Sequence, residues 1–340
     1  MSSVYFFFLT IFFILFLNYF FLKNNFLLDD IKFSKHKSLA KNIKRPISLG
    51  FIFVVFCLIF VENSFFQLKL FLFLFFIIGF LSDINIVTSA RFRLLFHIIL
   101  VLCFVIINNF FIKKIYLTTF DYLLLNKYFN VLFVTFCICV LINGKNFIDG
   151  LNTLLIGYVI LLLTCLYFIS INYSLNLDFN LYKITIIFFL ALYSVNFFGK
   201  SILGDGGSLS IGLFISHIIL NFYLINDSIS PYFIALLLWY PSFEILFSII
   251  RKASIGRQPF APDSLHLHQL LYKKVNYFKS TELNNTVASS FINLFNLFVF
   301  YLGSLKIYSN SYNIYLIFFS IFIYIVSYII LIKKSYNPTF

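Results

Sequence analysis

The sequence predicts an all-α polytopic membrane protein with about 11 transmembrane helices, an outside N-terminus and a cytoplasmic C-terminus. Hydrophobic residues make up 61% of the 340 residues and charged residues only 11%, and the mean hydropathy is +0.98. A soluble domain carries about 25% charged residues to hydrate its surface, so a water-soluble globule is excluded. Many of the apolar runs approach the ~20 residues that a helix needs to cross the hydrocarbon core.

Eleven apolar runs are expected to form the membrane helices, with ends uncertain by a few residues. They are 4–22, 46–61, 65–81, 94–112, 129–145, 153–171, 184–198, 208–224, 232–250, 286–304 and 313–332. The first run is not expected to be a cleaved signal peptide, because residues 1–3 carry no basic charge and no small-residue cleavage site follows.

The positions of the basic residues predict the orientation. With the N-terminus outside, 19 of the 25 Lys and Arg residues lie on the cytoplasmic side, including every Arg. The net charge of +13 is thereby explained by membrane topology, and no nucleic acid partner is expected. A single domain, 1–340, is predicted, whose active face is formed by five cytoplasmic loops. These loops are 23–45, 82–93, 143–152, 199–208 and 251–285.

Polar residues gather in four segments that this orientation puts at the cytoplasmic ends of helices: 79–83, 143–152, 204–208 and 251–268. A transporter usually places its site near the bilayer midplane. An enzyme that joins a soluble substrate to a lipid needs its polar groups at one interface, which this distribution favours. A flippase or solute transporter is the alternative, and it predicts ionisable residues deep inside the helices.

Asn143, Asn146 and Asp149 follow one another at intervals of three residues, which places them on one face at the end of a helix. Amides and a carboxylate are costly there unless they meet a ligand or a partner. Helix capping and contacts between helices are the alternative explanation. Gly150 is expected to let the chain turn, with Asn152 as the N-cap of the next helix.

The segment Gly204-Asp-Gly-Gly-Ser208 is expected to open a helix. Its free backbone N–H groups and the positive end of the helix dipole suit phosphate. Asp205 supplies an oxygen ligand of the kind that Mg²⁺ prefers. An ordinary turn with an Asp cap is the alternative.

Two other carboxylates are expected to pair with arginines. Asp83 is followed by Arg91 and Arg93. Considered without the other motifs, Asp83 would be explained as a carboxylate at the membrane interface that pairs with one of these arginines. Glu244 lies within an apolar run, seven residues before Arg251, and a structural pairing with that arginine is expected.

The segment 251–274 is the richest in polar residues. Asp263 is expected to cap a short helix that carries His266, Gln269 and Lys273 on one side. Imidazoles near Arg257 suit a pyrophosphate or an acidic leaving group. Lys273 and its neighbour could equally contact anionic lipid headgroups.

Several motifs together resemble those of the polyprenyl-phosphate N-acetylhexosamine-1-phosphate transferases (glycosyltransferase family 4). The motifs are Lys35-His36 through Arg45-Pro46, Asp83 with Arg93, Asn143 to Gly150, Gly204 to Ser208, and Pro259-Phe-Ala-Pro-Asp-Ser-Leu-His-Leu-His268. The eleven-span layout is similar to the undecaprenyl-phosphate GlcNAc-1-phosphate transferase branch, which starts O-antigen and other cell-surface glycans. The resemblance implies transfer of a sugar 1-phosphate from a UDP-N-acetylhexosamine to polyprenyl phosphate, with release of UMP.

The resemblance also implies the residues that do this work. The implied catalytic residues are Asp83, Asp149, His266 and His268. The implied ligands of Mg²⁺, or of Mn²⁺ as a substitute, are Asp205, Asn146 and Asp83. The implied substrate-binding residues are Asn143, Asn196, Gly206, Ser208, Arg257, Asp263 and Arg93. A bacterial inner-membrane location with the site facing the cytoplasm is expected, and assembly as a homodimer is left open.

This chain departs from the family pattern at three positions. Ser82-Asp83 stands where the family usually has Asp-Asp, Gln269 replaces the third His of the usual cluster, and His97 occupies a position that is often Gln. Ser82 matters most, because the acidic pair is associated with the metal or the lipid phosphate. A catalytically altered member of the family is therefore the second hypothesis.

Overall fold

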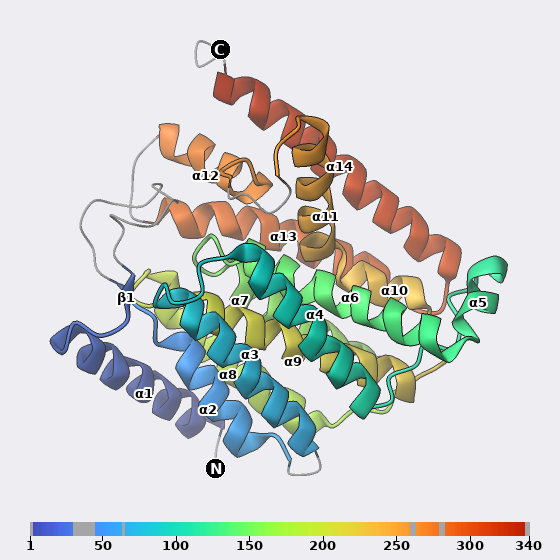
Figure 1. Cartoon of the computed structure of the whole chain (residues 1–340), viewed down its shortest axis with the longest axis horizontal. Coiled ribbons are helices and arrows are strands. Elements are labelled where there is room, and N and C mark those ends of the chain that lie inside the picture. The colour runs from blue at the N-terminus through green and yellow to red at the C-terminus, as the bar shows by residue number, and fades with distance from the viewer. Residues whose placement is uncertain (1–2, 30–44, 63–64, 259–262, 279–282, 337–340) are drawn as a thin grey trace.

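A computed structural model describes residues 3–29, 45–62, 65–258, 263–278 and 283–336, and these residues form a helical bundle (Figure 1). The helices are α1 (Ser3–Lys23), α2 (Leu49–Phe60), α3 (Phe66–Asp83), α4 (Ala90–Ile107), α5 (Thr118–Leu124), α6 (Lys127–Ile148), α7 (Leu154–Asn172), α8 (Phe179–Phe197), α9 (Gly204–Ile225), α10 (Pro231–Leu237), α11 (Trp239–Ser254), α12 (Leu267–Phe278), α13 (Asn284–Ser304) and α14 (Asn310–Tyr336). Two short strands, β1 (Leu28–Asp29) and β2 (Arg45–Pro46), pair antiparallel with Leu28 opposite Pro46.

Nine helices in the described part of the chain are long and apolar enough to cross a membrane, and the bent pair α10–α11 is a tenth candidate. The remaining expected span coincides with the shorter apolar helix α2. Each of the eleven predicted runs therefore contains helix, which supports a polytopic membrane protein. Several boundaries differ from the prediction by up to five residues: α4 covers 90–107 rather than 94–112, α8 begins at 179 rather than 184, and residue 46 belongs to β2 rather than to a helix.

The predicted span 232–250 is not one straight helix, because α10 and α11 meet at an angle of 74°. Pro241 lies in the first turn of α11 and has no N–H to donate to the carbonyl of Leu237. That carbonyl instead accepts a hydrogen bond from the hydroxyl of Tyr158, at 2.7 Å. The sequence does not reveal this break, because apolar residues continue on both sides of it.

Helix α9 lies at the centre of the bundle and packs against α2, α3 and α6. Small residues let the backbones come close, as in many membrane helix pairs. A Cβ atom on Gly79 would overlap the backbone of Gly206, and one on Gly50 would overlap that of Gly207. The N-terminal turn of α9 is thereby held directly against the end of α3.

The C-terminal helices form the other side of the molecule (Figure 1). Helix α11 packs on α6, α13 packs on α7, and α12 lies against both α13 and α14. This arrangement brings the segment after residue 263 to the end of α6, where the polar residues of the central helices also lie.

Candidate active site

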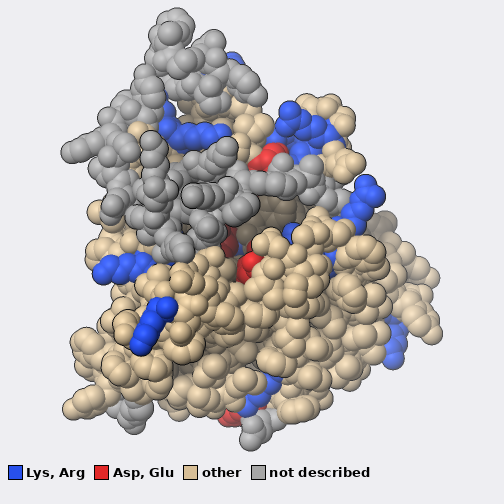
Figure 2. Space-filling view, turned by 60° about the vertical axis from the view of Figure 1, so that its left-hand side comes forward, with Lys and Arg blue, Asp and Glu red and all other residues tan. Residues whose placement is uncertain are grey.

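Three carboxylates lie at the ends of packed helices. Asp83 is the last residue of α3, Asp149 follows the last residue of α6, and Asp205 is the second residue of α9. Because α9 packs against both α3 and α6, the three helix ends form one layer at the same end of the bundle. Figure 2 shows acidic side chains beside a hollow on one face of the molecule. A single polar layer supports the enzyme hypothesis rather than the transporter.

Asp83 caps the N-terminus of α9. Its Oδ1 accepts a hydrogen bond from the backbone N–H of Asp205 (2.9 Å), and its Oδ2 accepts one from that of Gly206 (3.2 Å). A carboxylate at this position also interacts favourably with the helix dipole. The prediction that these two amides are free for phosphate is therefore wrong. The prediction that Gly204 opens a helix is confirmed.

Arg93 pairs with Asp205 rather than with Asp83. Its Nη1 lies 2.6 Å from Oδ2 of Asp205, and both side chains are partly exposed. The Ser82 hydroxyl donates a hydrogen bond to the same oxygen, at 2.8 Å, and accepts one from Arg93. The serine that departs from the family pattern thus takes part in the network around Asp205.

Asn143 and Asn146 lie near the C-terminal end of α6, close to Asp149. The Asn143 amide oxygen lies 3.1 Å from Nδ1 of His97 on α4. The Asn146 amide oxygen accepts a hydrogen bond from the Ser208 hydroxyl on α9, at 2.7 Å. These two amides join α6 to its neighbours on either side, so they also act as contacts between helices.

Asp149 is the C-cap of α6 and is half-buried. Desolvation raises the pKa of its carboxyl well above the usual value, and the negative charges of Asp205 and Asp83 raise it further. A raised pKa makes this carboxylate a stronger base than an ordinary aspartate. The next helix begins after Thr153, not after Asn152 as predicted, because Thr153 is the N-cap and adopts a left-handed conformation (φ 63°).

His266 and His268 lie at the start of α12, beside the end of α6. Their rings stack with centroids 5.5 Å apart. A Cβ atom on Gly150 would come within 2.7 Å of Nε2 of His268, so the histidine lies directly against this glycine. The ring of Phe147 packs edge-on against His266, at 5.1 Å. The structure therefore brings the histidine segment to the Asp149 turn.

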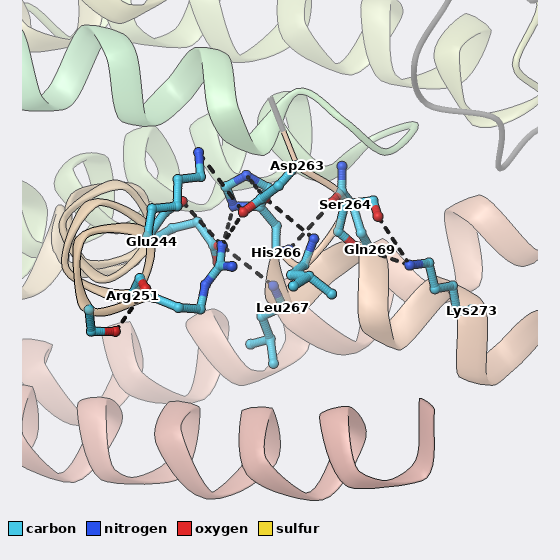
Figure 3. Close-up of polar contacts among 12 residues, drawn as sticks. Glu244, Arg251, Asp263, Ser264, His266, Leu267, Gln269 and Lys273 are labelled. Atoms are coloured by element: carbon cyan, nitrogen blue, oxygen red, sulfur yellow. Dashed lines mark hydrogen bonds and ion pairs between the residues drawn. The ribbon is translucent and has the colours of Figure 1, made fainter. Parts of the chain in front are cut away.

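Glu244 does not pair with Arg251, contrary to expectation. Arg251 instead binds Oδ2 of Asp263 at 2.7 Å, while Glu244 contacts His266 (Figure 3). Burial opposes ionisation of Asp263, but the hydrogen bond from Arg251 and the charges of His266, Arg251 and Lys252 hold its pKa below the usual value. The Asp263 carboxylate is thus already engaged inside the protein.

Two of the expected substrate-binding residues lie apart from these contacts. The Asn196 amide is buried, accepts a hydrogen bond from the Thr153 N–H and donates one to the carbonyl of Ser201. It ties the start of α7 to the loop before α9. The Arg257 side chain is exposed, just before residues 259–262. That segment and the Lys35-His36 part of the first motif lie outside the described residues.

The donor set near Asp205 fits a Mg²⁺ ion in its chemistry. The described contacts of the Asp205 carboxylate involve Oδ2, which leaves Oδ1 for a cation, and the Asn146 amide oxygen has a second lone pair. Among the described residues, no group of three or more His, Cys, Asp or Glu side chains could hold a metal by itself. Mg²⁺ is commonly bound by one or two carboxylates together with substrate phosphates, so the types of oxygen donor present here are compatible with such a site.

Comparison with known proteins covers the central helices. Residues 65–223 match the model of the glycosyl transferase family 4. An undecaprenyl-phosphate alpha-N-acetylglucosaminyl 1-phosphate transferase from Thermotoga maritima is 28% identical over 157 residues, which are 46% of this chain and 47% of the relative. A decaprenyl-phosphate N-acetylglucosaminephosphotransferase from Mycolicibacterium smegmatis is 29% identical over 152 residues, 38% of this chain and 37% of the relative.

A protein of the same name from Mycobacterium tuberculosis is 28% identical over 152 residues, 38% of each chain. The chain thus spans about half or less of the length of the curated relatives that it matches. The family match includes Asp83, Arg93, Asp149 and Asp205 but not the histidine segment. These matches confirm the resemblance that the motifs predict: over residues 65–223 the chain is similar to the glycosyl transferase family 4.

Proposed function

We propose that this chain transfers an N-acetylhexosamine 1-phosphate from a UDP-sugar to a polyprenyl phosphate, with release of UMP. The observation that carries the proposal is the meeting of Asp83, Asp149 and Asp205 with Arg93 in one layer, within the segment that matches the family. The reaction takes place at the cytoplasmic face of a bacterial inner membrane and is the first membrane step of a cell-surface glycan such as O-antigen.

In this reaction an oxygen of the prenyl phosphate attacks the β-phosphorus of the UDP-sugar. The new P–O bond forms as the bridging bond to the α-phosphate breaks, and UMP leaves. Asp149 would orient the acceptor phosphate and accept its proton, a role that its raised pKa supports. Arg93, which is partly exposed beside Asp205, would supply positive charge to the diphosphate.

Asp205, Asn146 and Asp83 are the residues that would hold Mg²⁺, with Mn²⁺ as a substitute. A divalent ion held there would supply positive charge to offset the negative charge of the diphosphate. Asp83 contributes by fixing the first turn of α9, and therefore Asp205, through its hydrogen bonds to two backbone amides.

The direct test is UMP release by the purified protein with undecaprenyl phosphate and a panel of UDP-N-acetyl sugars, with and without Mg²⁺. Asp205→Asn should reduce release by about a thousandfold or more while the protein stays folded. Asp178→Asn is the matched control, because Asp178 caps α8 through two backbone amides and Asn caps as well as Asp. Near-normal turnover of Asp205→Asn would refute the metal assignment. Lack of release by the wild type with every sugar would favour the catalytically altered alternative.

A further inference from the structure

Glu244 is a carboxylate inside the bundle, only 1% exposed, and both of its oxygens have partners. Its Oε1 lies 2.9 Å from Nδ1 of His266 and also accepts a longer hydrogen bond, at 3.4 Å, from the N–H of Leu267. Its Oε2 accepts a hydrogen bond from the hydroxyl of Tyr324, at 2.9 Å. A carboxylate in a membrane segment is costly unless it is paired, so this set of contacts explains why Glu244 is tolerated.

His266 lies between two carboxylates (Figure 3). Its Nδ1 faces Glu244, and its Nε2 lies 3.3 Å from Oδ1 of Asp263. The ring is 5% exposed. Because both ring nitrogens face carboxylates of the protein itself, the imidazole is fixed in orientation and is not positioned to use a nitrogen on the diphosphate.

His268 is the histidine that lies against the reacting layer. It stacks on His266 and packs on Gly150, the residue next to Asp149. A continuous series of contacts therefore runs from Tyr324 through Glu244 and His266 to the Asp149 turn. Its outer part belongs to helices beyond residues 65–223, the segment that matches the family.

We infer that Glu244 and Tyr324 are positioning residues, which act through His266 to hold the start of α12 and His268 over the Asp149–Gly150 turn. The inference rests on the transferase function proposed above and adds to it that α14 sets the geometry of the site. The Tyr324 hydroxyl does so by fixing one oxygen of Glu244, which leaves the other oriented toward His266 and the first N–H of α12.

Amide hydrogen exchange in detergent tests the anchor independently of any activity. Tyr324→Phe removes one hydrogen bond to a charged group, so exchange in α12 should become about tenfold faster, with α7 in the same protein unchanged. Tyr315→Phe is the matched control, because this tyrosine of the same helix is 73% exposed. Wild-type exchange in α12 of Tyr324→Phe would overturn the inference.

Steady-state kinetics test the link to the site. Tyr324→Phe should lower kcat for UMP release by about tenfold with little change in KM for the UDP-sugar, because small displacements of catalytic groups mainly slow the reacting step. Glu244→Gln should lower kcat further, and the double variant should lose no more than Glu244→Gln alone. A lower Tm with an unchanged kcat per folded molecule would show a merely structural role and would overturn the inference. If the wild type released no UMP, the transferase proposal alone would fall, and hydrogen exchange would still decide on the anchor.

Discussion

Arg93 and Asp205 form an ion pair in which Nη1 lies 2.6 Å from Oδ2. The guanidinium thus occupies one oxygen of the carboxylate proposed above as a ligand of Mg²⁺. The Ser82 hydroxyl donates a hydrogen bond to the same oxygen. Positive charge at Asp205 is therefore supplied by the protein itself, and Ser82 is hydrogen-bonded to both members of the pair.

Ser82→Asp should strengthen Mg²⁺ binding. A carboxylate at this position competes with Asp205 for Arg93 and adds an oxygen ligand, so the Mg²⁺ concentration at half-maximal UMP release should fall by about tenfold. The rise of Tm with Mg²⁺ gives a second measurement that does not require turnover. Ser82→Asn, which is similar in size but uncharged, is the control. Equal Mg²⁺ dependence of the two variants would contradict the prediction.

Gly79→Ala should separate α3 from α9. The new Cβ would overlap the backbone of Gly206, which cannot move aside as the end of a flexible side chain can. We expect a loss of about 1–3 kcal/mol in the free energy of unfolding and a large fall in activity, since Asp83 would lose its hydrogen bonds to α9. Gly303→Ala is the control, because its Cβ would meet the end of the Leu236 side chain. Equal Tm values for both variants in detergent would refute this account.

Much of the site was predictable because polar residues interrupt otherwise apolar runs. The spacing of Asn143, Asn146 and Asp149 places them together, and the glycines around Asp205 predict the start of α9. The cap that Asp83 provides was not predictable, because it joins residues 122 apart through the close packing of Gly79 on Gly206.

The partners of Glu244 were also beyond the sequence. Glu244 stood out as a carboxylate within an apolar run, but the nearest arginine in the chain was not its partner in space. Tyr324 carried no signal, because it is one of 22 tyrosines in a chain rich in aromatic residues. The break at Leu238 was hidden for a similar reason, since apolar residues continue through it.

Asp263→Asn should destabilise the protein at neutral pH and less so in acid. The pKa of Asp263 is lower in the folded state than in the unfolded chain, so its contribution is fully present above the unfolded value of about 4 and is lost as the pH falls through the folded value. The variant leaves Arg251 without its carboxylate partner, at a cost of about 1–3 kcal/mol. Thermal unfolding in detergent should therefore show a Tm difference at about pH 7 that narrows below about pH 4. A constant difference would show that the ion pair contributes nothing.

The acid limb of the pH–rate profile should report Asp149. Its carboxyl has a raised pKa because it is desolvated and lies near Asp205 and Asp83. As the pH falls, Asp149 should therefore become protonated above the ordinary aspartate pKa of about 4, and it can then no longer accept the proton of the phosphate. We expect kcat/KM for UMP release at saturating Mg²⁺ to fall on the acid side of the profile. Asp149→Asn should lower the rate by about a thousandfold. Asp178→Asn should keep the wild-type profile, because Asp178 lies at the start of α8 and makes only cap hydrogen bonds among the described contacts. A limb at or below about pH 4 would mean that Asp149 is not the group whose protonation limits the rate, and its role would then be confined to orienting the lipid phosphate.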